Sequence, residues 1–177
     1  MRYLDMDVNI KVLISEEEIQ NRVKEIAAQI SADYEGESVH LICILKGSLF
    51  FTADLARRMT VPVTFDFMSL ESYGERMVSS GKVKLTKDTE GDIGGKNVIV
   101  IEDIVDTGRT LSFLMDLLKS RNPKSLKLCT FLNKPERRVT EVEVDYVGFN
   151  IPDRFVVGYG MDYAQKYREL PYIGYIE

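Results

Sequence analysis

The stretch Val98-Ile99-Val100-Ile101-Glu102-Asp103-Ile104-Val105-Asp106-Thr107-Gly108-Arg109-Thr110 decides how the rest of this sequence is interpreted. The apolar run from Val98 to Ile101 predicts a buried strand, because strands covered on both faces are continuously apolar. Two adjacent carboxylates, Glu102 and Asp103, end that strand, and a mostly polar loop leads to Gly108. Apolar residues at helical spacing then predict a helix over 110–120. The predicted order is a buried strand, an acidic loop and a helix.

The loop in this stretch predicts a site for a sugar phosphate. Its backbone N–H groups and the N-terminus of the following helix form an anion site, and Gly108 lets the backbone approach a ligand closely. The hydroxyls of Thr107 and Thr110 can donate hydrogen bonds to the same anion. Acids just upstream would repel a bare phosphate, so we expect them to hold sugar hydroxyls or a hydrated Mg²⁺. The alternative is an ordinary strand, loop and helix whose acids are solvated.

Two other glycine-containing segments fail the usual tests for phosphate binding. Gly94-Gly95-Lys96 is followed by Asn97 and precedes a strand, whereas a P-loop follows one. Gly158-Tyr159-Gly160 begins like a dinucleotide fingerprint, but Tyr163 stands where the third glycine is needed. Both segments predict turns.

Apolar periodicity on either side of the central stretch predicts further strands and helices in alternation. A capping box from Ser15 to Glu18 begins a helix whose apolar positions continue to Ile30. A second helix is expected over 49–59, and strands are expected over 39–45, 63–68, 83–86, 98–101, 126–132, 146–149 and 155–157. Because helices recur between apolar strands, we expect an α/β fold with a largely parallel sheet. Ligands of such folds bind beyond the carboxyl ends of the strands.

Length and composition indicate one globular domain over residues 1–177. Of the 177 residues, 45% are hydrophobic and 29% are charged, and no apolar run approaches the ~20 residues that cross a bilayer. With acids early in the chain and no signal-like segment, we expect a soluble cytoplasmic protein. The net charge is −5 and the basic residues are scattered, which disfavours nucleic-acid binding. Cys43 and Cys129 lie in apolar runs and are expected to be buried, reduced and inert, and His40 is expected to be structural.

The stretch from Val98 to Thr110 resembles the 5-phosphoribosyl-1-pyrophosphate (PRPP) binding motif of the type I phosphoribosyltransferase family and matches it at every position. Other segments resemble the hypoxanthine-guanine branch, in its short bacterial form: Leu45-Lys46-Gly47-Ser48, Ser72-Tyr73, Phe131 to Pro135, Asp145 to Tyr163 and Tyr167 to Pro171. The resemblance extends from about Glu17 to Ile173. It implies a twisted, largely parallel sheet flanked by helices, with a small hood formed by N- and C-terminal segments.

The resemblance implies transfer of the phosphoribosyl group of PRPP to hypoxanthine, guanine or both, with release of pyrophosphate. Asp106 would be the general base near purine N7. Glu102 and Asp103 would hold the ribose hydroxyls and share a Mg²⁺ ion, and Asp162 would hold a second Mg²⁺ through water. The 5′-phosphate would be bound by Asp106, Thr107, Gly108, Arg109 and Thr110, with only a backbone or auxiliary role for Arg109.

The resemblance also implies the remaining contacts. Pyrophosphate would meet the backbone of Lys46 and Gly47, at a cis peptide, and the side chain of Arg168. Phe155 would stack on the purine, Lys134 would donate to its 6-oxo group and so reject adenine, and the backbone of Val156 would meet the base edge next to Asp162. Within the polar segment 69–82, Ser72 and Tyr73 would close over pyrophosphate as a lid. A homodimer or homotetramer is implied by resemblance alone.

Three alternatives stay open from the sequence. The acceptor could be another base, such as xanthine or guanine alone. A non-catalytic PRPP-binding regulator of the same fold would keep the phosphate loop without needing Asp106, Lys134 and Phe155 together. A plain α/β binding module explains none of the spacing.

Overall fold

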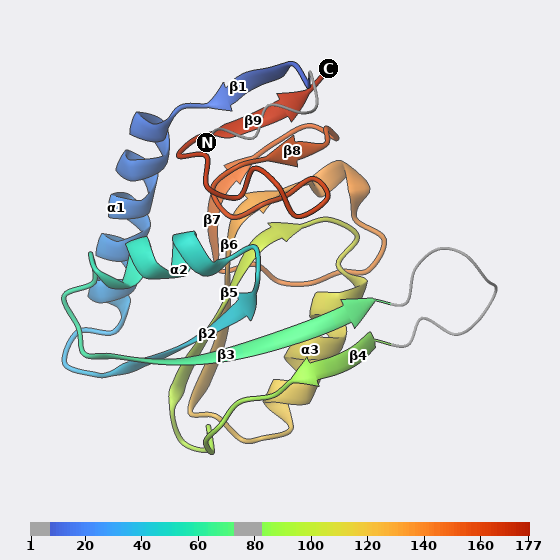
Figure 1. The fold of residues 1–177 in the computed structure, drawn as a ribbon. Helices are drawn as coiled ribbons and strands as arrows, with labels where there is room; N and C mark the ends of the chain where they lie inside the picture. Colours follow the sequence, from blue (N-terminus) through green and yellow to red (C-terminus); the bar gives the residue numbers. More distant parts are fainter. Residues whose placement is uncertain (1–7, 73–82) are drawn as a thin grey trace.

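The computed structural model describes residues 8–72 and 83–177, which form a six-stranded sheet, a three-stranded sheet and the helices around them (Figure 1). The strands are β1 (Ile10–Ile14), β2 (Val39–Leu45), β3 (Val63–Ser72), β4 (Val83–Lys87), β5 (Asn97–Val105), β6 (Ser125–Asn133), β7 (Tyr146–Asn150), β8 (Val156–Val157) and β9 (Ile173–Ile176). The helices are α1 (Glu16–Asp33), α2 (Leu49–Ala56) and α3 (Arg109–Lys119), with a 3₁₀ turn, η1, at Pro135–Arg137. The predicted α/β fold class is confirmed.

The large sheet has the strand order β4-β3-β2-β5-β6-β7. Every neighbouring pair from β3 to β7 is parallel, and β4 is an antiparallel edge strand. The connection from β2 through α2 leads to β3, on one side of the pair β2–β5, whereas the connection from β5 through α3 leads to β6, on the other. The chain therefore reverses its winding between β2 and β5, which is where open α/β sheets bind their ligands.

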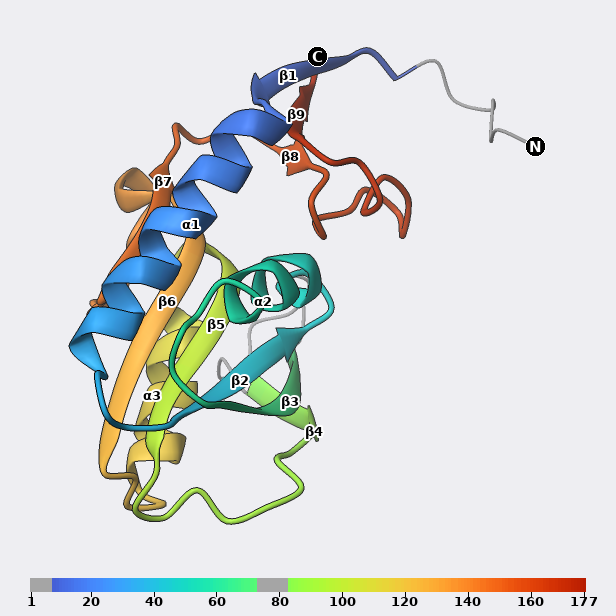
Figure 2. The ribbon, with the colours of Figure 1, turned by 90° about the vertical axis from the view of Figure 1, so that its left-hand side faces the viewer.

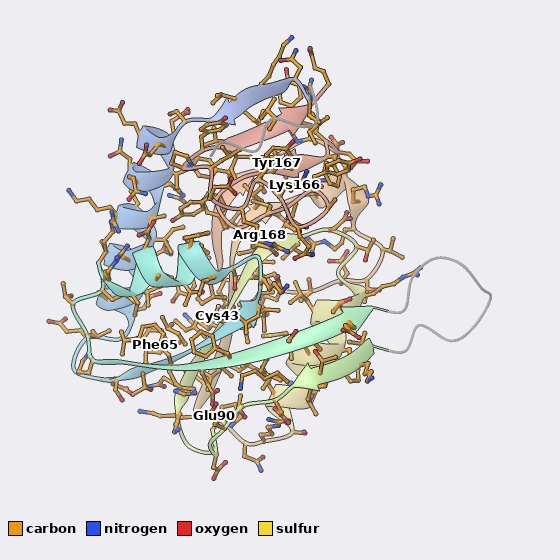
Figure 3. The ribbon with its side chains drawn as sticks, in the orientation of Figure 1. Cys43, Phe65, Glu90, Lys166, Tyr167 and Arg168 are labelled. Atoms are coloured by element: carbon orange, nitrogen blue, oxygen red, sulfur yellow. The ribbon has the colours of Figure 1, made fainter. Side chains whose placement is uncertain are left out.

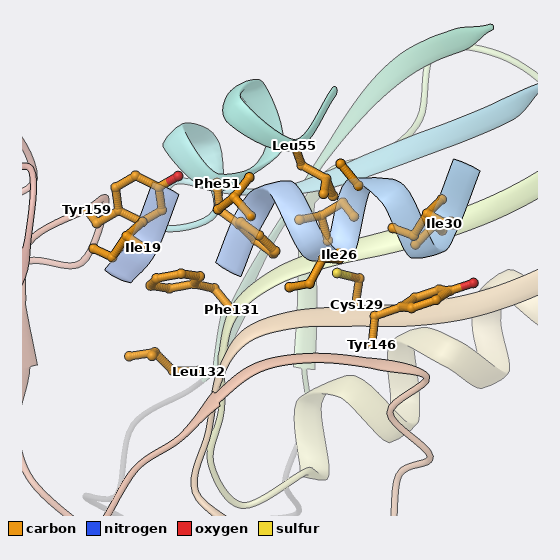
Figure 4. Packing of buried hydrophobic residues seen from close by; sticks show 14 of the residues in the cluster. Ile19, Ile26, Ile30, Phe51, Leu55, Cys129, Phe131, Leu132, Tyr146 and Tyr159 are labelled. Atoms are coloured by element: carbon orange, nitrogen blue, oxygen red, sulfur yellow. The ribbon is translucent and has the colours of Figure 1, made fainter. Parts of the chain in front are cut away.

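Helices cover both faces of this sheet, which explains the continuously apolar strands (Figure 2). On one face, α1 and α2 pack on β2, β5 and β6 through a cluster that includes Ile26, Phe51 and Phe131 (Figure 4). On the other face, α3 contributes Leu114 and Leu118 to a cluster with residues of β2 and β5. The two layers fix the carboxyl ends of the strands as a rigid edge.

The small sheet forms the predicted hood at one end of the molecule, above the carboxyl ends of β2, β5 and β6 (Figure 1). Its strand order is β1-β9-β8, so N- and C-terminal segments pair with each other. Tyr159, in the loop after β8, donates its hydroxyl to Asp54 Oδ2 on α2 at 2.7 Å. Burial, followed by that hydrogen bond, raises the pKa of Tyr159. The hood loop is thereby fastened to the helix that follows β2.

Several boundaries differ from those expected. Residues 102–108 were expected to form a loop, but β5 continues to Val105, because Ile104 and Val105 pair with β6. Similarly, β3 continues to Ser72 into the segment expected to be irregular, and α2 ends at Ala56 instead of residue 59. The strand expected over 155–157 is only Val156–Val157. Phe155 is therefore not a strand residue.

Smaller expectations are confirmed. Cys43 and Cys129 are free and buried, and burial raises the pKa of the Cys129 thiol, so that thiol stays protonated and inert. His40 is buried and lies 2.8 Å from Thr64 Oγ1 through Nδ1. Within 8–72 and 83–177, no helix is both long enough and apolar enough to cross a membrane.

Candidate active site

The loops that follow β2 and β5 meet at the point where the winding reverses. The peptide bond between Leu45 and Lys46 is cis, as the sequence resemblance implied. Gly47 lies so close to Asp103 that a Cβ atom at position 47 would overlap with the Asp103 carboxylate, and Gly160 of the hood loop lies equally close to the Gly47 carbonyl. Glycine at these positions lets three segments far apart in sequence converge on one spot.

The two acids at the end of β5 form a tight pair. The Asp103 N–H donates to Glu102 Oε1 at 3.2 Å, and the Ile104 N–H donates to Asp103 Oδ1 at 2.8 Å. Burial raises the pKa of Glu102 well above its usual range, and the negative charge of Asp103 raises it further. A cation or a set of hydroxyl donors beside this pair would relieve that unfavourable electrostatic environment.

A cavity of about 230 Å³ lies over the loop between β5 and α3. Glu102, Asp106, Thr107, Gly108 and Thr110 are among its lining residues. Gly108 caps α3 with a φ of +83°, a conformation that favours glycine, and so the first turn of the helix faces this loop. Because first-turn N–H groups have no partner inside their helix, they are available to an anion. The loop expected to bind phosphate therefore lines a cavity and is followed by the N-terminus of a helix.

A second cavity, of about 270 Å³, adjoins the first and is lined by Asp103, Ile104, Asp106, Lys134, Phe155, Val156, Met161 and Asp162. Lys134 is only 8% exposed, and its ammonium donates to the Arg154 carbonyl at 2.7 Å and lies 3.4 Å from Asp153 Oδ1. Phe155 is 56% exposed, with its ring set edge-on against that of Tyr163. An exposed ring opposite a buried cation is suited to a flat heterocycle with an oxygen on its edge.

Arg168, the side-chain cation expected for pyrophosphate, lies in the hood loop between β8 and β9 (Figure 3). Arg168 donates to the Gly160 carbonyl at 2.6 Å and forms an ion pair of 2.8 Å with Asp162 Oδ1. The Gln165 N–H donates to the other Asp162 oxygen at 2.7 Å, while Lys46 Nζ donates to Gln165 Oε1 at 3.2 Å. Gln165 thus links Lys46 to the pair formed by Arg168 and Asp162.

Asp106 is the only expected catalytic side chain, and it lines both cavities. Its Oδ1 accepts a hydrogen bond of 3.0 Å from Arg137 Nε. Arg137 is the last residue of η1, the 3₁₀ turn that begins just after Lys134. Its Nη1 donates to Asp153 Oδ2 at 3.1 Å. The hydrogen bonds that Arg137 donates to Asp153, and next to Asp106, raise the pKa of Arg137.

Most residues expected at the site come together there, and a few do not. Arg109 begins α3 and is exposed outside both cavities, which agrees with an auxiliary role at most. Ser72 is the last residue of β3, and Tyr73 lies outside the described residues, so the expected lid is not tested. Ile104 and Met161, which line the second cavity, and Arg137 were missed. No sequence pattern distinguishes Ile104 and Met161 from other apolar residues, or Arg137 from a solvated arginine.

The described residues contain no group of three or more His, Cys, Asp or Glu side chains arranged to hold a metal ion. Glu102 and Asp103 nevertheless form a pair of oxygen donors at the cavity edge, and Mg²⁺ commonly takes only one or two carboxylates from a protein, with water and substrate phosphates completing its shell. Both oxygens of Asp162 are already engaged by Arg168 and Gln165. The donor set therefore fits a Mg²⁺ ion that arrives with a phosphorylated ligand.

Comparison with known proteins gives consistent matches. Residues 15–164 match the family described as the phosphoribosyl transferase domain. A hypoxanthine phosphoribosyltransferase of Buchnera aphidicola is 52% identical over 171 residues, which cover 96% of this chain and 97% of that protein. A hypoxanthine-guanine phosphoribosyltransferase of Bacillus subtilis is 48% identical over 94% of this chain and 93% of its own length.

Solved structures agree with the sequence matches. A crystal structure of a hypoxanthine-guanine phosphoribosyltransferase from Bacillus anthracis superposes with a TM-score of 0.91 at 54% identity, covering 96% of this chain and all of that one. A hypoxanthine phosphoribosyltransferase from Staphylococcus aureus superposes with a TM-score of 0.90 at 47% identity, over 94% of this chain and 91% of the other. The structural similarity therefore extends over nearly the whole chain.

Proposed function

This chain belongs to the phosphoribosyl transferase family, and we propose that it acts as a purine salvage enzyme. It transfers the 5-phosphoribosyl group of PRPP to hypoxanthine, guanine or both, and it releases pyrophosphate. The observation that carries this proposal is the position of Asp106, whose side chain lines both the phosphate cavity and the cavity with Lys134 and Phe155. A carboxylate between a ribose phosphate and a base can take a proton from the base as the new bond forms.

In the proposed reaction, purine N9 forms a bond to C1′ of the ribose as the bond from C1′ to the pyrophosphate oxygen breaks. The electron pair of that bond leaves with pyrophosphate, and the proton on purine N7 moves to Asp106. Loop N–H groups with Thr107 and Thr110 hold the 5′-phosphate, while the backbone of Lys46 and Gly47 and the side chain of Arg168 receive pyrophosphate. Arg168 exchanges its ion pair with Asp162 for the leaving group. Fixed donors aimed at developing charge are the usual source of such stabilisation.

The purine cavity selects 6-oxopurines in this proposal. Phe155 stacks on the ring, the Val156 backbone meets its edge, and Lys134 donates to the 6-oxo group. Adenine carries an amino group at that position, which is itself a donor and would leave the buried ammonium facing another donor. Mispairing of a buried polar group is costly, and sites built this way reject the wrong substrate strongly.

Mg²⁺ would be held by Glu102 and Asp103 together with substrate oxygens, and a second Mg²⁺ would contact Asp162 through water. When bound, Mg²⁺ supplies positive charge to the departing pyrophosphate. The protein's own part is to present the carboxylates: Asp103 is oriented by the Ile104 N–H, and Glu102 by the Asp103 N–H.

We also place the protein in the cytoplasm, as a single domain that assembles into a homodimer or homotetramer without nucleic acid or membrane partners. Free, buried cysteines suit a reducing compartment. Leu49 and Phe50 on α2 are exposed apolar side chains, as is Phe65 on β3 (Figure 3), and contact with a second copy would cover side chains of this kind.

A product assay tests the proposal. The protein is incubated with PRPP and Mg²⁺ and with hypoxanthine, guanine, xanthine or adenine, with and without a chelator. We expect metal-dependent nucleotide from hypoxanthine or guanine and none from adenine. Binding of PRPP with no product from any base would instead favour the non-catalytic regulator.

The variant Asp106→Asn separates catalysis from binding. We expect turnover to fall by roughly 10²–10⁴, the range typical of a lost acid–base group, while the Kd for PRPP stays within about threefold of wild type. Asp116→Asn, the same change on the exposed side of α3, is the matched control and should behave as wild type. Undiminished turnover in Asp106→Asn would remove this residue from its role.

A further inference from the structure

Arg137 bridges two carboxylates, those of Asp106 and Asp153. Its Nε donates to Asp106 Oδ1 at 3.0 Å, and its Nη1 donates to Asp153 Oδ2 at 3.1 Å. Asp153 also lies 3.4 Å from Lys134 Nζ through its other oxygen. Hydrogen bonding to Arg137, and next to Lys134, lowers the pKa of Asp153 despite the opposing effect of burial, so its charge persists at neutral pH. Four side chains of alternating charge therefore connect Asp106 to Lys134.

Arg137 reaches Asp106 from outside the ligand space. Among the described residues, Arg137 lines neither the 230 Å³ cavity nor the 270 Å³ cavity, whereas Asp106 lines both. The hydrogen bond that Arg137 donates engages Asp106 Oδ1. A guanidinium in this position can fix the carboxylate without filling the space that a purine needs.

The backbone around Arg137 is fastened to the same loop. The Val139 and Thr140 N–H groups both donate to the Thr107 carbonyl at 3.0 Å, and the Lys134 N–H donates to the Val105 carbonyl at 2.9 Å. The segment that carries Arg137 is thus held at both ends against the residues that flank Asp106. Such anchoring keeps the guanidinium within reach of the carboxylate, which a free surface arginine could not do at low entropic cost.

We propose that Arg137 is a positioning residue for the general base, and that through Asp153 it joins Asp106 to Lys134 as one connected unit. Purine N7 and the 6-oxo group lie on the same edge of the base, so their two protein partners must be spaced correctly relative to each other. Arg137 sets that spacing: it fixes Asp106, and Asp153 transmits the constraint to the lysine ammonium. The inference rests on the proposed function and deepens its account of the purine side.

The charged side chains near Asp106 explain why its carboxylate needs to be held in place. Lys134, Asp103 and Asp162 line the same cavity as Asp106, and Glu102 lines the other. Lys134 is the one cation among the described residues that line the two cavities, so it is the group that would attract a freed Asp106 carboxylate. Without Arg137, the carboxylate would be free to turn toward Lys134 and occupy the place of the purine edge.

Kinetics of Arg137→Gln, measured beside wild type, test the proposal. We expect kcat/KM for hypoxanthine to fall about tenfold, because small displacements of a catalytic group cost one to two orders of magnitude, while the KM for PRPP stays within about twofold. Arg137→Lys keeps the charge and should recover part of the loss. Arg121→Gln removes a comparable ion pair, with Asp88, and is the matched control expected to behave as wild type.

A double-mutant cycle with Asp106 separates positioning from general destabilisation. In an Asp106→Asn background, Arg137→Gln should have no further effect on turnover, because it acts only through the residue already removed. Independent, multiplying losses, or an equal loss of PRPP binding, would overturn the proposal, as would wild-type kinetics in Arg137→Gln. If wild type itself makes no nucleotide, the proposed function has failed instead.

Discussion

At the scale of single residues, glycines allow the segments of the site to approach one another. Gly108 combines a φ of +83° with a close approach, because a Cβ atom there would overlap with the Thr140 carbonyl oxygen and touch the side chain of Arg138. Gly36, after α1, has a similar φ of +77°, but within the described part of the chain nothing lies within 4 Å of an added Cβ. Comparison of Gly36 with Gly108 therefore distinguishes the cost of backbone strain, which both would have, from the cost of steric overlap, which only Gly108 would have.

Gly108→Ala and Gly36→Ala should therefore differ. We expect Gly36→Ala to cost about 1 kcal/mol in unfolding free energy, the price of a left-handed alanine, with PRPP binding unchanged. Gly108→Ala should cost more and weaken PRPP binding at least tenfold, because the loop must shift away from Thr140. Urea unfolding and calorimetric titration with PRPP measure the two effects. Equal effects of the two variants on PRPP binding would contradict this account.

At the scale of elements, α1 shows how local sequence fixes a boundary. Ser15 Oγ accepts from the Glu18 N–H at 3.3 Å, and Glu18 Oε2 accepts from the Ser15 N–H at 2.8 Å, which is the capping box that the sequence predicts. The hydrogen bond from the Ser15 backbone N–H, and next the one that the Ser15 hydroxyl donates to Glu18 Oε2, lower the pKa of Glu18. The helix so begun covers one face of the sheet without touching the described site.

Ser15→Ala should accordingly destabilise the fold without altering catalysis. Loss of an N-cap hydroxyl costs about 0.5–2 kcal/mol, and we expect that loss in urea unfolding, with kcat unchanged. Ser120→Ala, at the C-terminus of α3, is the control. It removes a hydroxyl that donates to the exposed last turn of that helix, and the free energy of unfolding should fall by less than about 0.5 kcal/mol. A fall in kcat for Ser15→Ala would show a link between α1 and the site that the fold does not provide.

Sequence patterns predicted the elements with the strongest periodicity and misjudged those decided by pairing. The buried strands β2, β5 and β6 were expected because continuous apolar runs need burial on both faces. The extension of β5 through Val105 was not, since only its neighbour β6 supplies the hydrogen bonds that keep the acidic residues extended. Strands β1 and β9 are short and pair with each other across the whole length of the chain, which local periodicity cannot reveal.

Site residues were likewise predicted where a local motif contains them, and missed where a distant contact decides their role. Residues adjacent in sequence, such as Asp106, Thr107 and Gly108, were recognised together because the motif itself specifies the loop. Arg137 was missed because its role depends on a contact with Asp106, which lies 31 positions earlier in the sequence. An arginine in a polar turn is ordinarily a solvated charge.

At the scale of the whole molecule, His40 makes the stability of the fold depend on pH. Burial lowers the pKa of His40, and the nearby charge of Lys96 lowers it further, so the imidazole is neutral in the folded protein. The unfolded chain binds a proton near pH 6.5, whereas the folded chain does so only at lower pH. Stability is therefore fully present above about pH 6.5 and decreases as the pH falls below it.

Unfolding free energies measured in urea from pH 7.5 down to 5.5 check this dependence. We expect a decrease whose slope stays below about 1.4 kcal/mol per pH unit, the limit set by a single proton. His40→Asn, which keeps a hydrogen-bonding group beside Thr64 but does not titrate, should be nearly flat over this range. Carboxylates with lowered pKa values, such as Asp88, affect stability only in more acidic solution. Parallel curves for the two proteins would assign the effect to another group.

The hood has a mechanical consequence. Ile10 lies opposite Ile176 and Ile14 opposite Ile173, so the two chain ends leave the β1–β9 pair at the same end. Tension between those ends would separate β1 from β9 one hydrogen bond at a time, because the force acts at one end of the pair. The hydrogen bonds would not all be loaded together. Peeling of β9 would next release β8 and the adjoining Phe155, while the parallel sheet with its phosphate loop is still intact. Under tension between the chain ends, the hood would therefore unfold first, and the purine cavity would be lost before the phosphate cavity.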